Sequence, residues 1–251
     1  QIETSDHYSD ACLRCHSATY ILAPQDKKPT LADFKEGALK GDRYGITCVV
    51  CHDPHKSTEF EYQLRKDPQE TCTQCHLAGS VKAGDAPHHA QKEIFEGVAA
   101  IGVPSTPNPK QIKCVDCHMM NGNHFFRVGT PTFTYKWHGA DTVADSCVSC
   151  RSSMTADRIE AIRAATRARI EVLNAKLDAI KARLAELKQG GKDVSALQAV
   201  YDATYTNVHL VESDKSMGIH NVPYVQAILD KASADVGYLE TQIGAPAASA
   251  H

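Results

Sequence analysis

A short motif occurs four times in the first half of this chain and constrains everything the chain can fold into. Each copy has two cysteines separated by two residues and followed directly by histidine; the copies are Cys12/Cys15/His16, Cys48/Cys51/His52, Cys72/Cys75/His76 and Cys114/Cys117/His118. In c-type haem attachment, both thiols of this motif bond to the haem and the histidine ligates the iron. A zinc site or a disulfide does not need a histidine after every second cysteine. The four copies therefore predict four covalently bound haems c.

A fifth cysteine pair, Cys147 and Cys150, is followed by Arg151 instead of histidine, and the five pairs together use all 10 cysteines. Arginine stays protonated in proteins and has no lone pair to offer to iron. Three interpretations stay open: a haem whose iron takes its ligands from elsewhere in the chain, a haem with an open iron position, and a disulfide. The first two predict a fifth haem c at Cys147/Cys150.

Histidines outside the motifs can close each iron on its second side. Of the 13 histidines, nine lie outside the intact motifs, whereas the chain has only four methionines, so bis-histidine iron is expected. The predicted second ligands are His220, His124, His55 and one of His88 and His89. His138 and His7 are further candidates. His209 and His251 are assigned to packing or solvent. An iron with both axial positions filled suits electron transfer and leaves no place for a substrate.

The first 151 residues lack the apolar residues for a protein core of ordinary kind. Aromatic residues make up only 6% of the chain, and residues 1–150 contain few long apolar runs. Buried haems would supply the missing apolar surface. We therefore expect a mainly α multihaem cytochrome c fold with little regular sheet, in which residues 1–151 form a haem-packed, multihaem-binding region.

Residues 152–251 contain no cysteine and have helical periodicity. An apolar stripe with spacings of three and four residues is formed by Ile170, Leu173, Leu177, Ile180, Leu184 and Leu187. It predicts a long helix over about 155–189, followed by helices over about 194–211 and 222–243, in a C-terminal helical region that contributes a haem ligand. The stripe packs either against the next helix or against another subunit, and both options stay open; the second predicts a homo-oligomer.

Charge and hydropathy limit the partners and the location. The formal net charge of −3 gives no basic surface for nucleic acid, and no stretch approaches the roughly 18 apolar residues of a membrane span. No signal peptide opens the chain. Because haem is normally attached outside the cytoplasmic membrane, we expect a trimmed, exported chain located in the periplasm or outside the cell. The expected partners are redox proteins or copies of this chain, which also allows a filament.

The arrangement resembles the pentahaem ammonia-forming cytochrome c nitrite reductases and their octahaem relatives, which include hydroxylamine oxidoreductase and tetrathionate reductase. The resemblance covers about residues 40–240 and is carried by residues 45–55, Leu64 and Arg65, the motifs at Cys72 and Cys114, and Ser216 to Asn221. It implies that His220 is the distal ligand of the Cys114/Cys117 haem. It also implies that His124 serves the Cys48 haem and that His88 or His89 serves the Cys72 haem.

The chain departs from these reductases where their catalytic residues lie. Their lysine after the first cysteine pair is His16 here, their tyrosine after the third motif is replaced by Leu77 to Ser80, and their histidine before the fourth motif has no counterpart in Pro109 to Lys113. The resemblance therefore supports the haem scaffold and not nitrite reduction, so we expect an electron-transfer protein rather than an enzyme. Two alternatives remain: a nitrite, hydroxylamine or tetrathionate reductase with an open haem at Cys147/Cys150, and a subunit of a conductive cytochrome filament.

Overall fold

The computed structural model describes residues 8–42, 45–55, 59–108, 112–126, 128, 136–137, 141–142, 147 and 153–244. The predicted sites at His7, His138, Cys150 and Arg151 lie outside these residues, as does His251. The chain divides into two compact units, Gln1–Cys75 and His76–His251, so the third motif spans the boundary. The predicted boundary at residue 151 rests on where the cysteines lie. It stays a prediction about which residues bind haem.

The first unit is built from short helical segments around the cysteine motifs. In chain order these are α1 (Asp10–His16), α2 (Ala18–Leu22), η1 (Gln25–Lys27), α3 (Leu31–Lys35), α4 (Cys48–Cys51), η2 (Glu61–Gln63) and α5 (Pro68–Thr73). Among its described residues, only four apolar side chains are buried, namely Leu13, Ala18, Phe34 and Val50. So small an apolar core cannot hold a unit of this size together without a further apolar component.

The second unit carries the fourth motif and three long helices. Its elements are α6 (Gln91–Glu96), α7 (Cys114–His118), η3 (Met120–Gly122), β1 (Lys136–Trp137), β2 (Asp141–Thr142), α9 (Ala156–Gln189), α10 (Ser195–Asp214) and α11 (Val222–Ile243). The strands form a two-stranded antiparallel sheet in which Lys136 pairs with Thr142 and Trp137 with Asp141. The prediction of a mainly α fold with little sheet is confirmed.

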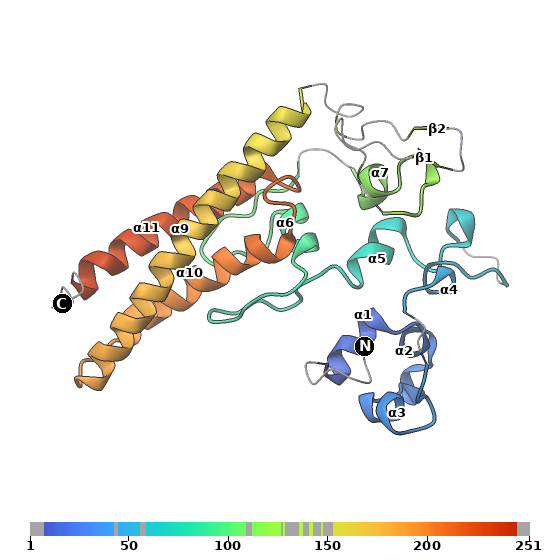
Figure 1. Ribbon diagram of the computed structural model, residues 1–251, viewed down its shortest axis with the longest axis horizontal. Helices are drawn as coiled ribbons and strands as arrows, with labels where there is room; N and C mark the ends of the chain where they lie inside the picture. Colours follow the sequence, from blue (N-terminus) through green and yellow to red (C-terminus); the bar gives the residue numbers. More distant parts are fainter. Residues whose placement is uncertain are drawn as a thin grey trace. The chain divides into compact units, whose positions relative to one another are not determined.

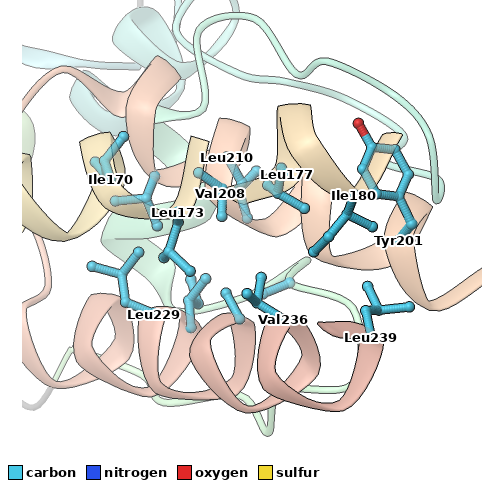
Figure 2. Packing of buried hydrophobic residues seen from close by; sticks show 14 of the residues in the cluster. Ile170, Leu173, Leu177, Ile180, Tyr201, Val208, Leu210, Leu229, Val236 and Leu239 are labelled. Atoms are coloured by element: carbon cyan, nitrogen blue, oxygen red, sulfur yellow. The ribbon is translucent and has the colours of Figure 1, made fainter. Parts of the chain in front are cut away.

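Helices α9, α10 and α11 lie side by side and enclose one apolar core (Figure 1). Thr155 caps α9 by accepting a hydrogen bond from the backbone N–H of Arg158. Figure 2 shows Ile170, Leu173 and Leu177 of α9 directed toward Val208 of α10 and Leu229 of α11. The stripe predicted from the sequence is thus buried within its own chain. A second subunit cannot use it, and the predicted homo-oligomer loses this support.

The described helices also bear on membrane insertion. None of the helices in the ranges above is both long and apolar enough to cross a membrane.

The contact between α9 and α11 is bordered by ion pairs at the surface, with Arg169 2.7 Å from Asp230 and Lys176 3.0 Å from Glu240. Exposed pairs of this kind contribute little to stability.

Gly97 is the position where α6, the following loop and the start of α11 converge. It ends α6 with a left-handed φ of 70°. The backbone N–H of Thr106 donates to the Gly97 carbonyl at 2.9 Å, and the Asn221 side chain donates to the Thr106 carbonyl at 2.9 Å. A Cβ atom at Gly97 would lie 1.9 Å from the Thr106 carbonyl oxygen, so no other residue fits here without moving the backbone.

We therefore expect Gly97→Ala to lower the free energy of unfolding by roughly 3 kcal/mol, the sum of left-handed strain and overpacking. Gly79→Ala is the matched control, since Gly79 also has a positive φ (77°) but a Cβ there meets nothing within 4 Å. It should cost only about 1 kcal/mol. Denaturant unfolding of the haem-loaded chain measures both; equal losses would show that the close approach of Thr106 is not limiting.

Candidate haem sites

The second motif is clamped by the segment that follows it. Cys48 and Cys51 lie on α4, and Arg65 donates from its backbone N–H to the Cys51 carbonyl (2.8 Å) and from Nε to the Val49 carbonyl (2.7 Å). The Arg65 guanidinium also pairs with Asp53 at 2.9 Å, and the Asp53 side chain is nearly buried. Arg65 thus contacts the motif at Val49 and Cys51 and pairs with Asp53, the residue that directly follows it.

The same segment orients the motif histidine. His52 Nδ1 lies 2.7 Å from the carbonyl oxygen of Tyr62, whose backbone is left-handed with a φ of 58°. A neutral imidazole that donates from Nδ1 keeps its lone pair on Nε2. A carbonyl partner for the other ring nitrogen is the usual way in which a metal-binding histidine is oriented. In that tautomer, Nε2 is the nitrogen of His52 that could bind a metal.

The fourth motif repeats this arrangement. His118 is the last residue of α7, and its Nδ1 lies 3.2 Å from the carbonyl oxygen of Phe126, another left-handed aromatic residue (φ 56°). Burial lowers the pKa of the His118 ring, so the ring is held neutral. Metal binding requires a neutral imidazole. His118, like His52, thus offers Nε2.

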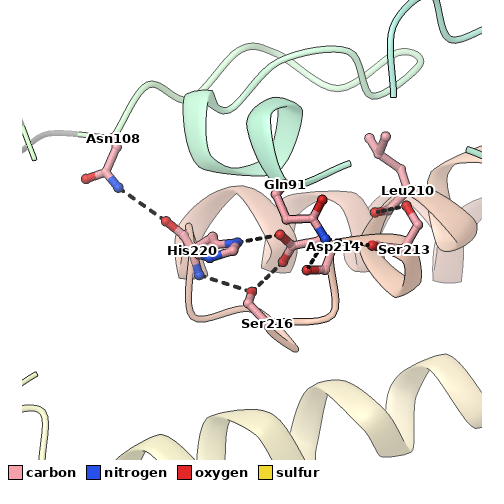
Figure 3. Close-up of polar contacts among 7 residues, drawn as sticks. All are labelled: Gln91, Asn108, Leu210, Ser213, Asp214, Ser216 and His220. Carbon is pink, nitrogen blue, oxygen red and sulfur yellow. Dashed lines mark hydrogen bonds and ion pairs between the residues drawn. The ribbon is translucent and has the colours of Figure 1, made fainter. Parts of the chain in front are cut away.

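His220 lies in the turn between α10 and α11, where it is tied to a carboxylate (Figure 3). Its Nδ1 is 2.5 Å from Asp214 Oδ1, its backbone N–H donates to Ser216 Oγ at 3.1 Å, and its carbonyl accepts from Asn108. Burial lowers the pKa of the His220 ring, but the hydrogen bond and charge of Asp214 outweigh it, so the pKa is raised overall. Nδ1 is again occupied, so Nε2 is the nitrogen that a metal could bind, and metal binding would displace the proton that the raised pKa favours there.

Two pairs of histidine rings have the separation of axial ligands on one iron. The ring centres of His118 and His220 are 6.1 Å apart, and those of His76 and His89 are 5.9 Å apart. Imidazoles on opposite sides of a metal, with metal–nitrogen bonds of about 2 Å, have ring centres about 6 Å apart. These donor sets therefore fit haem c attached at the fourth and third motifs.

The remaining candidate histidines have other surroundings. The ring of His88 packs against that of His89 at 3.9 Å between centres. His124 Nδ1 lies 2.8 Å from the Gly122 carbonyl oxygen. The backbone N–H of His55 donates to Asp53, while the ring of His16 meets the edge of the Tyr8 ring at 5.8 Å. The ring of His124 also meets that of Phe126, with 6.1 Å between the ring centres.

The first and third cysteine pairs lie close together within the first unit. The Cys15 thiol donates to the Cys75 carbonyl at 3.8 Å, and the Cys75 thiol lies 4.0 Å from the Arg14 carbonyl. Burial, followed by the neighbouring Cys15, raises the pKa of the Cys75 thiol to about 12. Haems attached at these two pairs would be bonded to neighbouring points of the chain.

Sequence reasoning missed four groups that orient histidines: the carboxylate of Asp214 and the carbonyls of Tyr62, Gly122 and Phe126. The carbonyls leave no trace in a sequence, because every residue has one. Asp214 had a signal, since it lies six residues before His220 in a turn rich in polar residues, with Ser216 between them.

Comparisons with known proteins find the same doubled motif and two cytochromes of known structure. A family model described as a doubled CXXCH motif matches residues 40–80, which hold the second and third motifs. Among solved structures, the undecahaem cytochrome from the S-layer of Carboxydothermus ferrireducens is 30% identical, with a TM-score of 0.72 over 98% of this chain and 40% of that one. The outer cell wall cytochrome OcwA is 29% identical, with a TM-score of 0.65 over 94% of this chain and 47% of that one.

This chain thus spans less than half the length of either solved structure. No curated protein matches it. The doubled motif and the two likenesses support a multihaem c-type cytochrome that binds haem c. Both likenesses are to cytochromes of the cell surface, and the resemblance to nitrite reductases and their octahaem relatives stays a prediction.

Proposed function

We propose that this chain carries electrons through closely packed, bis-histidine haems c and acts outside the cell or at its envelope. The observation that carries the proposal is the spacing of the ring pairs His118/His220 and His76/His89, which matches filled axial positions. Haem c supplies one-electron exchange at its iron when bound. The S-layer and cell wall cytochromes named above support the location.

The chain's own residues have three tasks in this function. The cysteines Cys12, Cys15, Cys48, Cys51, Cys72, Cys75, Cys114 and Cys117 attach four haems, and Cys147 with Cys150 attaches a fifth. The histidines His16, His52, His76 and His118 ligate iron on one side. On the other side, His220 pairs with His118 and His89 pairs with His76, because His89 rather than His88 has the axial spacing. His124 serves the second motif, as the resemblance implies.

Ligand exclusion follows from this ligand set. An iron held by two imidazoles has no position for a substrate, so the four motif haems should not bind small anions. His55 or His7 would close the first haem, and His138 is a further ligand candidate. An enzyme would need an iron with an open position. The cysteine pair Cys147/Cys150, which is followed by Arg151, is the only place that the sequence leaves for such an iron.

Spectroscopy and turnover separate the two functions. The ferric, haem-loaded chain should show only low-spin signals in electron paramagnetic resonance, take up one electron per haem reversibly, and not change its spectrum with cyanide or nitrite. Reduction of nitrite, hydroxylamine or tetrathionate at about 1 s⁻¹ or faster, the range of ordinary enzymes, would overturn the proposal. A high-spin signal that responds to cyanide would show that one haem has an open iron position and would favour the enzyme.

A further inference from the structure

Asp214 is the last residue of α10, and its carboxylate is fully buried. Oδ1 accepts the hydrogen bond from His220 Nδ1, and Oδ2 accepts from the Ser216 hydroxyl, as Figure 3 shows. The chain reverses immediately afterwards at Lys215, which has a left-handed φ of 63°. The turn from Asp214 to His220 is therefore folded around this carboxylate.

Few groups compensate the charge of Asp214. Within the described ranges, the only ion-pair partner of the carboxylate is the His220 ring. Gln91 approaches the same place, but its side-chain amide donates to the backbone carbonyls of Ser213 and Asp214 and not to the carboxylate. Burying a carboxylate whose only described side-chain partners are one imidazole ring and one hydroxyl costs folding free energy. Its presence here therefore points to a role other than stability.

We propose that Asp214 is a positioning residue that fixes the ring of His220 and lowers the reduction potential of the haem attached at Cys114 and Cys117. The proposal rests on the proposed function, because it requires His220 to ligate that iron. A carboxylate that accepts the Nδ1 proton of a ligating histidine makes the ring a stronger electron donor to the metal. The same negative charge, in a medium of low dielectric constant, favours the ferric over the ferrous iron.

Substitutions of the carboxylate and of the hydroxyl that donates to it should shift the reduction potential in opposite directions. Asp214→Asn keeps the size of the side chain and removes the charge, so the potential of one haem should rise. Ser216→Ala removes the hydroxyl that partly compensates the charge, so the potential of the same haem should fall. A merely structural role for the turn would not produce opposite shifts from two neighbouring substitutions.

The test is a potentiometric titration of the haem-loaded chain, followed by absorbance and electron paramagnetic resonance. Asp214→Asn should change the ferric/ferrous equilibrium of one haem about tenfold, which is about 59 mV for one electron. Glu212→Gln is the matched control, because it removes a carboxylate that pairs with His209 at 3.0 Å from the same helix end. It should change the ferric/ferrous equilibrium of every haem by less than twofold.

Equal shifts in Asp214→Asn and Glu212→Gln, or shifts of the same sign in Asp214→Asn and Ser216→Ala, would overturn the inference. A haem count and a low-spin spectrum like those of the parent chain show that each variant has folded. His220→Ala distinguishes a failure of the proposed function from a failure of the role inferred for Asp214. If it leaves every haem low-spin, the ligand assignment in the proposed function fails; if it opens one haem while Asp214→Asn shifts nothing, only the role of Asp214 fails.

Discussion

Replacing His220 with alanine should convert one haem of the ferric chain from low-spin to high-spin. Alanine has no lone pair, so the iron facing His118 would lose the ligand whose ring centre lies 6.1 Å from that of His118. The opened position should then bind cyanide, which the parent chain does not. The expected change is about one haem per chain, read from the loss of one low-spin signal in electron paramagnetic resonance and from cyanide titration.

His209→Ala is the control for this experiment. His209 also has a ring on α10 whose Nδ1 pairs with a carboxylate, in this case Glu212 at 3.0 Å, but no motif histidine has been found at axial spacing from it. Its removal should leave all haems low-spin. If His220→Ala leaves the spin state of every haem unchanged, His220 is not a ligand, and the pairing at the fourth motif is wrong.

A chain to which no haem is attached should keep its three-helix bundle and lose the structure of its first unit. The described part of residues 1–75 buries only the four apolar side chains named above, whereas the bundle encloses an extended apolar cluster. Burial of apolar area is the main favourable contribution to folding. Residues 8–75 should therefore open with a free energy near 0, while α9, α10 and α11 resist opening by several kcal/mol.

Hydrogen exchange on the 251-residue chain with all ten cysteines changed to alanine measures the stability of each unit without haem. Amides in α1 to α5 should exchange at nearly unprotected rates, and those of α9 to α11 should stay protected. The packing of Ile94 and Ala90 against the bundle predicts that α6 is protected too, although it follows the third motif. Strong protection in α1 to α5 without haem would show that the first unit folds by its own side chains.

The parts of the fold that were predictable are those with repeating patterns. Helix α9 was expected over 155–189 and spans Ala156–Gln189, because its stripe repeats over several turns and Thr155 is a strong cap residue. Helix α10 runs to Asp214, three residues past its expected end at residue 211. It stops at a left-handed Lys215 rather than at a glycine, so the usual signal for a helix end is missing.

The candidate sites divide in the same way. The cysteines and their adjacent histidines were predictable because covalent attachment fixes residue types at fixed spacing. The proximity of His89 to His76 was not, because neighbouring histidines have the same chemistry; the choice of His89 over His88 as a ligand remains a proposal. Asp214, Tyr62 and Phe126 were missed because their contacts depend on how separate segments fold back on the motifs.

The most direct test of a multihaem, covalently loaded chain is its haem content. Intact mass spectrometry combined with a pyridine haemochrome assay, on chain exported through a haem attachment system, counts the haems bonded to each chain. Four must be present if the motifs at Cys12, Cys48, Cys72 and Cys114 are all used, and a fifth is expected at Cys147 and Cys150. Three or fewer haems on the fully processed chain would contradict the assignment of one covalent haem to each of the four motifs, on which the multihaem account rests.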